Sequence, residues 1–354
     1  MPRYILFIPS LLLSCCLALA SAVAHPAVLR SGFIYETAPY PECHASTIVE
    51  TSPGKLVAAW FGGTKEKNPD VCIWVSHFEN DKWAEAKNVA DGLQPDGKRH
   101  PTWNPVLFQP PGKGAPLILF YKVGPSPTTW WGMQIKSTDG GHTWSAPERL
   151  PDGILGPIKN KPVVLTDGSW LSPSSTESRK DGWQVHFECS RDAGKTWTVI
   201  GPVRKGPNFD AIQPSVLFFP GGRLEALCRT RQGVIAMTWS EDRGRTWSPL
   251  AATGLPNPNS GTDAVTLRDG RQLLIYNHSA HRPDRPGKGW RYPIGLALSD
   301  DGIQWRRSVT LDDAPLPEGY AYPAIIQTAD GLVHATYTWD RKRIRHVVIN
   351  PSLL

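Results

Sequence analysis

Cysteine is scarce in this chain, which has only 6 among 354 residues, and no two of them form a Cys-x-x-Cys pair. The absence of such pairs, and of any other metal-type spacing, excludes the common structural zinc sites. Two cysteines belong to an apolar N-terminal run, and the other four lie far apart: Cys43, Cys72, Cys189 and Cys228. These four could form one or two disulfides in an oxidising compartment or stay as buried free thiols, and their spacing allows both.

Long apolar runs are also rare, and the one that occurs is N-terminal. Residues 4–20 read YILFIPSLLLSCCLALA between a short charged segment and a run of small residues. This pattern predicts a cleaved signal peptide over residues 1–24. A membrane anchor is disfavoured because the run is short, and a lipoprotein site at Cys15 because the run continues past it. We therefore expect a secreted or periplasmic protein without stable membrane insertion, whose residues 25–354 form a single domain.

No nucleic-acid-binding module is recognisable, although the chain is basic. Its formal net charge is +6, its pI is near 9.0, and it contains 15 tryptophans and 34 prolines. A basic, tryptophan-rich and secreted chain favours an anionic or sugar-like ligand over nucleic acid. We expect a carbohydrate partner and a monomeric protein.

One octapeptide pattern, Ser-x-Asp-x-Gly-x-Thr-Trp, occurs three times. The copies are STDGGHTW at 137, SRDAGKTW at 190 and SEDRGRTW at 240. Weaker copies are SHFENDKW at 76 and SDDGIQW at 299, so successive copies are 61, 53, 50 and 59 residues apart. A period of this size indicates a propeller or a solenoid.

The segments between the copies are short β-type runs broken by Gly, Pro, Asp and Asn, and none has a helical 3.6-residue stripe. They predict an all-β fold, a six-bladed β-propeller of four-stranded antiparallel blades. Only three strands are expected in the last unit, near 322–327, 332–338 and 343–349. The segment VLRSGFIYE near the N-terminus could supply the fourth strand and close the ring.

The octapeptide itself is interpreted as a hairpin lock. Its Asp can accept bonds from turn N–H groups, its Gly tolerates positive φ, and its Trp buries a large face under the turn. Because one active site does not need five copies, Asp139 is not expected to be a catalytic acid.

This pattern resembles the Asp-box, or BNR repeat, of the sialidase (neuraminidase) superfamily, and the resemblance covers essentially all of residues 25–354. It implies a six-bladed propeller whose active site lies at the centre of the ring, away from the boxes. Asp-boxes occur in propellers of many functions, so the site has to be sought separately.

The resemblance implies arginines that clamp a carboxylate, a nucleophilic Tyr helped by a Glu, and an acid/base Asp. LEALCRTR matches one arginine strand and points to Arg229, and RYPIGLALSDDG points to Arg291. YAYPAIIQTADG matches the segment of the nucleophile, which would be Tyr322. NPDVCIW matches the segment of the acid/base, which would be Asp70.

The chain also departs from the family pattern. CHASTI has His44 where the first clamp arginine is expected, and AIQPSVLFF offers Gln213 near the place of the Glu partner. GPIKNKPVVL puts Lys159 and Lys161 into a stretch that is usually Gly-rich, and we expect both to bind substrate. Glu177 is a candidate to replace the missing Glu.

Further candidates follow from the residues alone. Arg229 and Arg231 share a strand face with Glu225, which could pair with them, and both arginines are expected to bind substrate. Asn277 begins a glycosylation sequon or lines the centre. The tail DRKRIRH is interpreted as a solvated strand face.

These residues predict an exo-acting, retaining glycoside hydrolase for a terminal acidic sugar such as sialic acid, with no metal and no cofactor. Tyr322 would attack the anomeric carbon while Asp70 protonates the leaving oxygen. The alternatives are a glycosidase or lyase for another uronic or neutral sugar, with His44 or Tyr322 as the lyase base, and a non-catalytic carbohydrate-binding propeller.

Overall fold

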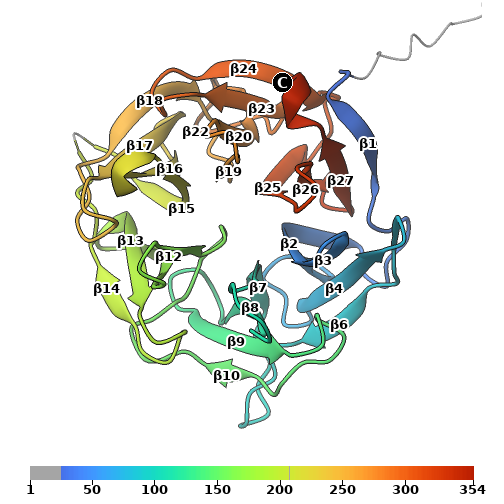
Figure 1. Ribbon diagram of the computed structural model, residues 1–354. Helices are drawn as coiled ribbons and strands as arrows, with labels where there is room; N and C mark the ends of the chain where they lie inside the picture. The colour runs from blue at the N-terminus through green and yellow to red at the C-terminus, as the bar shows by residue number, and fades with distance from the viewer. Residues whose placement is uncertain (1–24, 207) are drawn as a thin grey trace, which may run out of the picture.

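Six β-sheets surround a central axis in the computed structural model, which describes residues 25–354 except residue 207 (Figure 1). The elements described are strands and two short 3-10 turns, η1 (Pro220–Gly222) and η2 (Pro351–Leu353). No helix in this part of the chain is long and apolar enough to cross a membrane. The predicted all-β, six-bladed propeller is confirmed, whereas the predicted signal peptide lies outside the described residues.

The blades are antiparallel sheets whose strands follow one another from the axis outward. Blade 1 contains β2 (Glu42–Ser52), β3 (Lys55–Gly63), β4 (Cys72–Glu79), β5 (Lys82–Trp83) and β6 (Lys87–Ala90). Blade 2 contains β7 (Thr102–Phe108), β8 (Leu117–Val123), β9 (Trp131–Ser137) and β10 (Glu148–Arg149). Blade 3 contains β11 (Val163–Val164), β12 (Trp170–Ser178), β13 (Gly182–Ser190) and β14 (Thr198–Ile200).

The second half of the ring repeats this arrangement. Blade 4 contains β15 (Ala211–Phe218), β16 (Leu224–Thr230), β17 (Val234–Ser240) and β18 (Ala251–Pro256). Blade 5 contains β19 (Asp263–Thr266), β20 (Gln272–Asn277), β23 (Ile294–Ser299) and β24 (Arg306–Asp312), with a hairpin of β21 (His281–Arg282) and β22 (Arg285–Gly289) inserted between β20 and β23. Blade 6 contains β25 (Tyr320–Gln327), β26 (Val333–Trp339) and β27 (Arg343–Ile349).

An N-terminal strand completes blade 6, as the sequence predicted. Strand β1 (Val28–Phe33) pairs with β27 as the outermost strand, with Phe33 opposite Arg345. This pairing joins the two ends of the described chain and leaves blade 6 with four strands. The ring is therefore closed by hydrogen bonds between strands.

The three full boxes are turns capped by their aspartates. Asp139 Oδ1 accepts bonds from the N–H groups of His142 (3.0 Å) and Thr143 (2.9 Å), and Oδ2 accepts from the Thr143 hydroxyl (2.6 Å). The other two full boxes repeat these bonds. The Thr143 bonds hold the pKa of Asp139 well below its usual range. The hairpin-lock interpretation of the boxes therefore agrees with the structure.

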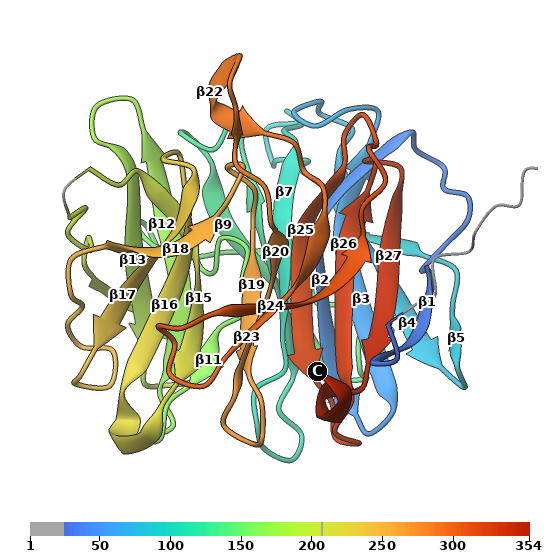
Figure 2. The ribbon, with the colours of Figure 1, turned by 90° about the horizontal axis from the view of Figure 1, so that it is seen from above.

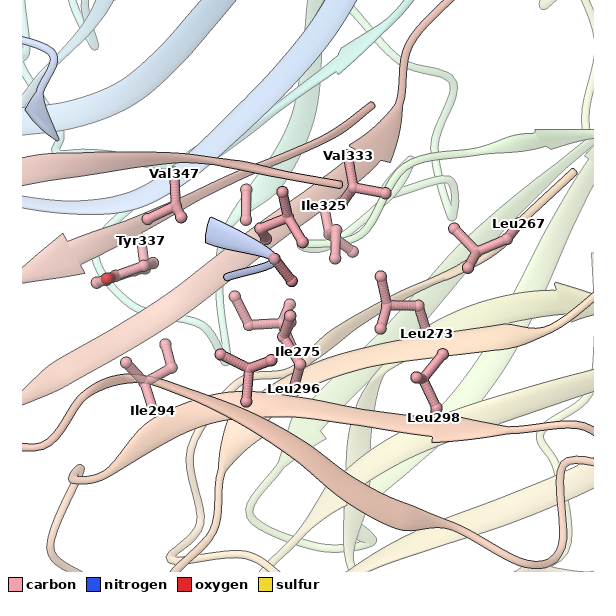
Figure 3. Packing of buried hydrophobic residues seen from close by; sticks show 14 of the residues in the cluster. Leu267, Leu273, Ile275, Ile294, Leu296, Leu298, Ile325, Val333, Tyr337 and Val347 are labelled. Atoms are coloured by element: carbon pink, nitrogen blue, oxygen red, sulfur yellow. The ribbon is translucent and has the colours of Figure 1, made fainter. Parts of the chain in front are cut away.

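The hydrophobic core lies between neighbouring blades. Strands of blades 5 and 6 build one cluster that includes Leu273, Ile275, Leu296, Ile325 and Val347, all at most 1% exposed (Figure 3). Blades 1 and 2 share a second cluster, and blades 3 and 4 a third. Because each blade packs against its neighbours, the ring is a rigid support for residues at its centre.

Four inner strands begin with the same irregularity. The ladder between the inner and second strands skips two residues, and the first of the two has positive φ, at Ala45 (58°), Asn104 (30°), Gln213 (60°) and Tyr322 (50°). Such bulges re-aim side chains, and left-handed conformations of non-glycine residues cluster at functional sites. Two of the four residues, Gln213 and Tyr322, are among the predicted site residues.

Candidate active site

One face of the ring gathers all the predicted site residues. Neighbouring strands are antiparallel, so inner strands start on the face where second strands end. The boxes join third and fourth strands and therefore lie on the opposite face, and the β21–β22 hairpin projects from the site face (Figure 2). Inner strands or the segments leading into them hold His44, Lys159, Lys161, Gln213 and Tyr322. Second-strand ends and the loops after them hold Asp70, Glu177, Arg229, Arg231, Asn277 and Arg291.

Tyr322 is the centre of a hydrogen-bonded cluster. Its hydroxyl oxygen lies 2.9 Å from Arg229 Nη1 and 3.1 Å from Gln213 Nε2, and both nitrogens donate to it. The Arg229 Nη1 also donates to Gln213 Oε1 at 3.3 Å, which fixes the orientation of the amide. Two N–H donors on one phenol oxygen would stabilise negative charge on that oxygen. No carboxylate among the described residues hydrogen-bonds to Tyr322.

His44 lies against the tyrosine ring, with the two ring centroids 4.3 Å apart. It is 2% exposed, and its Nδ1 has no hydrogen-bond partner among the described residues. Burial lowers the pKa of His44 well below its usual value, and the charges of Arg341, Arg291 and Arg229 lower it further. His44 is therefore neutral and does not supply the positive charge of the arginine that the family pattern places there.

Among the described residues, the side chain of Arg291 has no hydrogen-bond or ion-pair partner. The charged groups that act on its guanidinium are Arg229, Arg341 and Glu66. Burial lowers the pKa of Arg291 to about 10, and the neighbouring charge of Arg229 contributes. A partly desolvated guanidinium without an anion is unfavourable, so its position favours an anionic ligand.

Arg341 is a third arginine at the centre, which the sequence interpretation missed. It belongs to the tail DRKRIRH, but its side chain is only 17% exposed and pairs with Glu66 Oε2 at 2.8 Å and Glu318 Oε2 at 3.3 Å. The interpretation of this tail as a solvated strand face is wrong at this residue. Arg341 lies two residues beyond the end of β26, the second strand of blade 6. Arg229, near the end of β16, and Arg231, just after it, lie at a similar place in blade 4.

The loop between β3 and β4 contributes two carboxylates that are placed differently. Glu66, which the sequence interpretation also missed, pairs with Arg341, and its charge acts on Arg291 and Glu177. Asp70 is exposed, and its Oδ2 accepts from the N–H (2.7 Å) and hydroxyl (2.5 Å) of Thr64. Burial raises the pKa of Asp70, but the Thr64 bonds outweigh it and hold the pKa below its usual range. No described residue of the tyrosine cluster bonds to Asp70.

Arg229 and Arg231 both pack on Trp183, whose ring centre lies 5.2 Å and 4.2 Å from their guanidinium carbons. Glu177 is next to this indole, and burial raises its pKa against the lowering charge of Arg229. Glu177 has no hydrogen bond to Tyr322, so the structure does not place it as a direct base for the phenol. Arg229 Nε donates to Asn259 Oδ1 at 2.9 Å, which completes the support of this arginine.

The expected pairing of Glu225 with these arginines is wrong. Glu225 lies at the start of β16, near the opposite face, and neither carboxyl oxygen has a hydrogen-bond partner among the described residues. Burial raises its pKa to about 9. Glu225 and Arg229 point to the same face of the sheet but lie at opposite ends of β16. The alternation of side chains along a strand predicts the shared face and does not reveal this separation.

Other predicted residues are held by the wall of the centre. Asn277 is fully buried and donates to the carbonyls of Tyr320 (3.1 Å) and Pro293 (3.3 Å), so the glycosylation alternative does not fit the structure. Lys159 is 4% exposed, and Lys161 Nζ pairs with Asp263 at 2.9 Å. These lysines bond to protein oxygens.

The four cysteines outside the N-terminal run are free, which resolves the alternative left open by their spacing. The described residues contain no group of three or more His, Cys, Asp or Glu side chains that could hold a metal ion.

Comparison with known proteins agrees with this geometry. The model of the BNR repeat-like domain matches residues 54–335. An anhydrosialidase from Macrobdella decora is 26% identical over 260 residues, which cover 64% of this chain and 33% of that protein, so the match spans about a third of that relative's length. The Hadza microbial sialidase Hz136 has a TM-score of 0.76 at 17% identity, with 92% of this chain and 69% of that chain covered. A Dyadobacter fermentans protein of unknown function has a TM-score of 0.74 at 18% identity, with 92% of this chain and 99% of that chain covered.

The match to the family model covers most of the chain, and the solved structures share its fold. The chain therefore belongs to the BNR repeat-like domain family, as a sialidase-like six-bladed β-propeller with sialidases among its distant homologues.

Proposed function

We propose that this protein is a secreted, exo-acting, retaining glycoside hydrolase for a terminal sugar that carries a carboxylate, with sialic acid the first candidate. The proposal rests on one observation: the guanidinium of Arg291, which has no partner among the described residues, lies near the Tyr322 hydroxyl, which accepts two hydrogen bonds. The guanidinium of Arg291 would bind an anion. The hydroxyl of Tyr322 would be a nucleophile, and its two hydrogen-bond donors would stabilise negative charge on the oxygen. The sialidase relatives favour the same chemistry.

The carboxylate of the sugar would bind Arg291. Arg229 and Arg341 add positive charge near Arg291. Arg229, however, is bonded to Asn259, Gln213 and Tyr322, and Arg341 is paired with two glutamates. Of these three arginines, Arg291 is the one whose donors form no hydrogen bond within the described residues. Planar bidentate recognition of a carboxylate suits a guanidinium better than an ammonium group.

Tyr322 would act as the nucleophile in its ionised form. Its oxygen attacks the anomeric carbon, the bond from that carbon to the leaving oxygen breaks, and the leaving oxygen takes a proton from Asp70. Water then attacks the same carbon, gives its proton to Asp70, and the bond to Tyr322 breaks. Two displacements at one carbon give net retention of configuration.

Asp70 needs to move for this role, because Thr64 holds its carboxylate within its own loop. Catalytic hydrogen bonds often form only in the substrate complex, and the exposed loop leaves room for such a change.

A second candidate function is β-elimination on a uronic sugar. It is favoured by the lack of a carboxylate on Tyr322 and by the neutral His44 ring against it. In that reaction the tyrosine oxygen takes the proton from the carbon that bears the carboxylate. A carbon–carbon double bond forms, and the bond from the next carbon to the leaving oxygen breaks. That oxygen leaves with the proton that the tyrosine has taken up, which returns the tyrosine to its starting state.

A panel of fluorogenic glycosides tests the proposal. It contains a sialoside, uronides and neutral hexosides, and the anomeric configuration of the first product is followed by proton NMR. We expect turnover of an acidic sugar with retention and none of the neutral sugars. Turnover of neutral sugars alone, or inversion, contradicts the proposal, and an ultraviolet-absorbing unsaturated product assigns the elimination instead.

Secretion, monomeric state and the carbohydrate partner belong to the same proposal. They are supported by the N-terminal pattern, by the closed ring and by the relatives named above. N-terminal sequencing of exported protein and its mass in solution test the first two.

A further inference from the structure

The stretch GPIKNKPVVL has lysines where the family pattern is Gly-rich, and in the structure it forms hydrogen bonds to residues of other blades. Lys159, Asn160 and Lys161 extend from blade 3 to the axis, and Asp263 of blade 5 meets them there. These four residues are called the central lock. All but Lys161 are at most 4% exposed.

Lys159 uses all three of its donors inside the protein. Its Nζ donates to Asn160 Oδ1 at 2.8 Å, to the Thr262 carbonyl at 2.9 Å and to the Pro323 carbonyl through a short bond. The three acceptors match the three N–H groups of an ammonium ion. Lys159 thus ties blade 3 to blades 5 and 6, and one of its bonds falls on the residue after Tyr322.

The Pro323 carbonyl belongs to the bulge that carries the tyrosine. Tyr322 has a φ of 50°, a conformation that non-glycine residues adopt only when their surroundings impose it. Ser46 Oγ donates to the Tyr322 carbonyl at 3.4 Å, and Lys159 donates to the next carbonyl. The two carbonyls that set the bulge are therefore held from blades 1 and 3.

Asn160 holds the bulge at Gln213 through hydrogen bonds to its backbone carbonyls. Its Nδ2 lies 2.9 Å from the Gln213 carbonyl, 3.1 Å from the Pro214 carbonyl and 2.7 Å from Ser215 Oγ. Gln213 also has positive φ, at 60°. Adjacent residues of blade 3 thus hold the two bulges whose side chains meet at the tyrosine hydroxyl.

Asp263 anchors the lock. Its Oδ2 accepts from Lys161 Nζ and from the Ile325 N–H, both at 2.9 Å, and Oδ1 accepts from Ser215 Oγ at 3.1 Å. Lys122 of blade 2 donates to the Pro157 carbonyl at 2.8 Å and contacts none of the four lock residues through a hydrogen bond.

We propose that Lys159 is a positioning residue, which holds the Tyr322 bulge so that the phenol meets Arg229 and Gln213. This inference rests on the proposed function of Tyr322 as the reacting group. Lys159 does not touch the sugar in this arrangement, because its donors are already used. Its effect on the reaction passes through the backbone at Pro323.

Lys159→Met tests the proposal, because methionine has a similar length and no donors. We expect Tyr322 to leave its positive φ in a crystal structure of the variant, and its hydroxyl to lose the Arg229 and Gln213 bonds. A misplacement of about 1 Å lowers rates on the order of 100-fold, so kcat should fall by about that factor. KM should change by less than about threefold, because binding at Arg291 is unaffected.

Lys122→Met is the matched control. Lys122 is also a fully buried lysine with a carbonyl acceptor, but its bond falls on Pro157, away from the tyrosine. We expect this variant to lose stability and to keep kcat within about threefold, with Tyr322 in place. Equal losses of kcat in both variants, or an unmoved Tyr322 in Lys159→Met, overturn the positioning role.

Gly261→Ala provides a second route if Lys159→Met does not fold. A Cβ there would lie 3.3 Å from Gln213 Oε1, 3.3 Å from Lys159 Cε and 3.4 Å from Tyr322 Cδ2. The added methyl group requires Gln213 Oε1 and Lys159 Cε to shift by a few tenths of an ångström, which should disturb the tyrosine's bond to Gln213 and lower kcat. Gly32→Ala, which meets no atom within 4 Å, should do neither. An undisplaced tyrosine with unchanged kcat in Gly261→Ala contradicts the proposal.

If the wild-type protein turns over no sugar, the proposed function fails, and the position of Tyr322 in these crystal structures still decides the positioning role.

Discussion

Replacing Arg291 by methionine should stabilise the fold and abolish most of the activity. The structure gives the Arg291 side chain no partner among the described residues, and burial together with the charge of Arg229 lowers its pKa to about 10. A base whose pKa is lowered on folding destabilises the folded state at every pH below the lowered value, because it is charged there. The charge of Arg291 therefore opposes folding throughout the neutral range.

The size of the effect follows from the shift. About 2.5 pKa units correspond to about 3 kcal/mol, and solvent at the partly open side chain screens part of it. Arg291→Met should raise the free energy of unfolding by roughly 1–3 kcal/mol and the melting temperature by a few degrees. Loss of a charge-assisted contact to the substrate should lower kcat/KM about 30- to 5,000-fold.

Thermal unfolding and steady-state kinetics on the best substrate of the panel check both effects together. Arg306→Met is the control, because Arg306 is an exposed arginine of the same blade and should change neither quantity. If Arg291→Met loses stability, or keeps its activity, Arg291 is a structural residue and the anion site lies elsewhere.

Three further changes have defined outcomes. Tyr322→Phe should lower kcat by at least about 1,000-fold with little change in melting temperature, and activity within tenfold of wild type rules out the nucleophile. Asp70→Asn should lower kcat/KM about 100-fold or more for glycosides with poor leaving groups and much less for activated aryl glycosides, and equal losses contradict its role as acid. Burial raises the pKa of Glu225 from 4.5 to about 9. The free energy of unfolding of the wild type is therefore highest below pH 4.5 and decreases steadily as the pH rises from 4.5 to about 9. Glu225→Gln should remove this slope, a gain on the order of 3 kcal/mol over wild type between pH 5 and 7 in urea unfolding, and an unchanged slope refutes it.

Much of the fold could be predicted because it repeats. Each box forms the turn of one hairpin, and the spacing between boxes gives the number of blades. This holds even though the copy at 76 retains little of the pattern. Closure by β1 followed from counting strands in the last unit. Each of these features depends on local turn chemistry and on the alternation of short strands, which a single sequence displays.

The site was only partly predictable because its residues are not periodic. Arg229, Arg291 and Tyr322 were found by resemblance, and the structure brings them together. Arg341 was missed because the charged tail around it has the composition of a solvated strand, and only its place after a second strand marks it. The lysines at 159 and 161 suggested an anion pocket, but carbonyls and a buried aspartate from distant blades bind them, and sequence spacing does not show such contacts.

Covalent capture of the tyrosine is the most direct test of the reaction proposed here. A fluorinated analogue of the sugar selected by the panel slows breakdown of the intermediate, and peptide mass spectrometry locates the attached sugar. The proposed mechanism predicts an adduct on the peptide that contains Tyr322, absent from Tyr322→Phe. An adduct on another residue, or turnover without any adduct and with an unsaturated product, would contradict it.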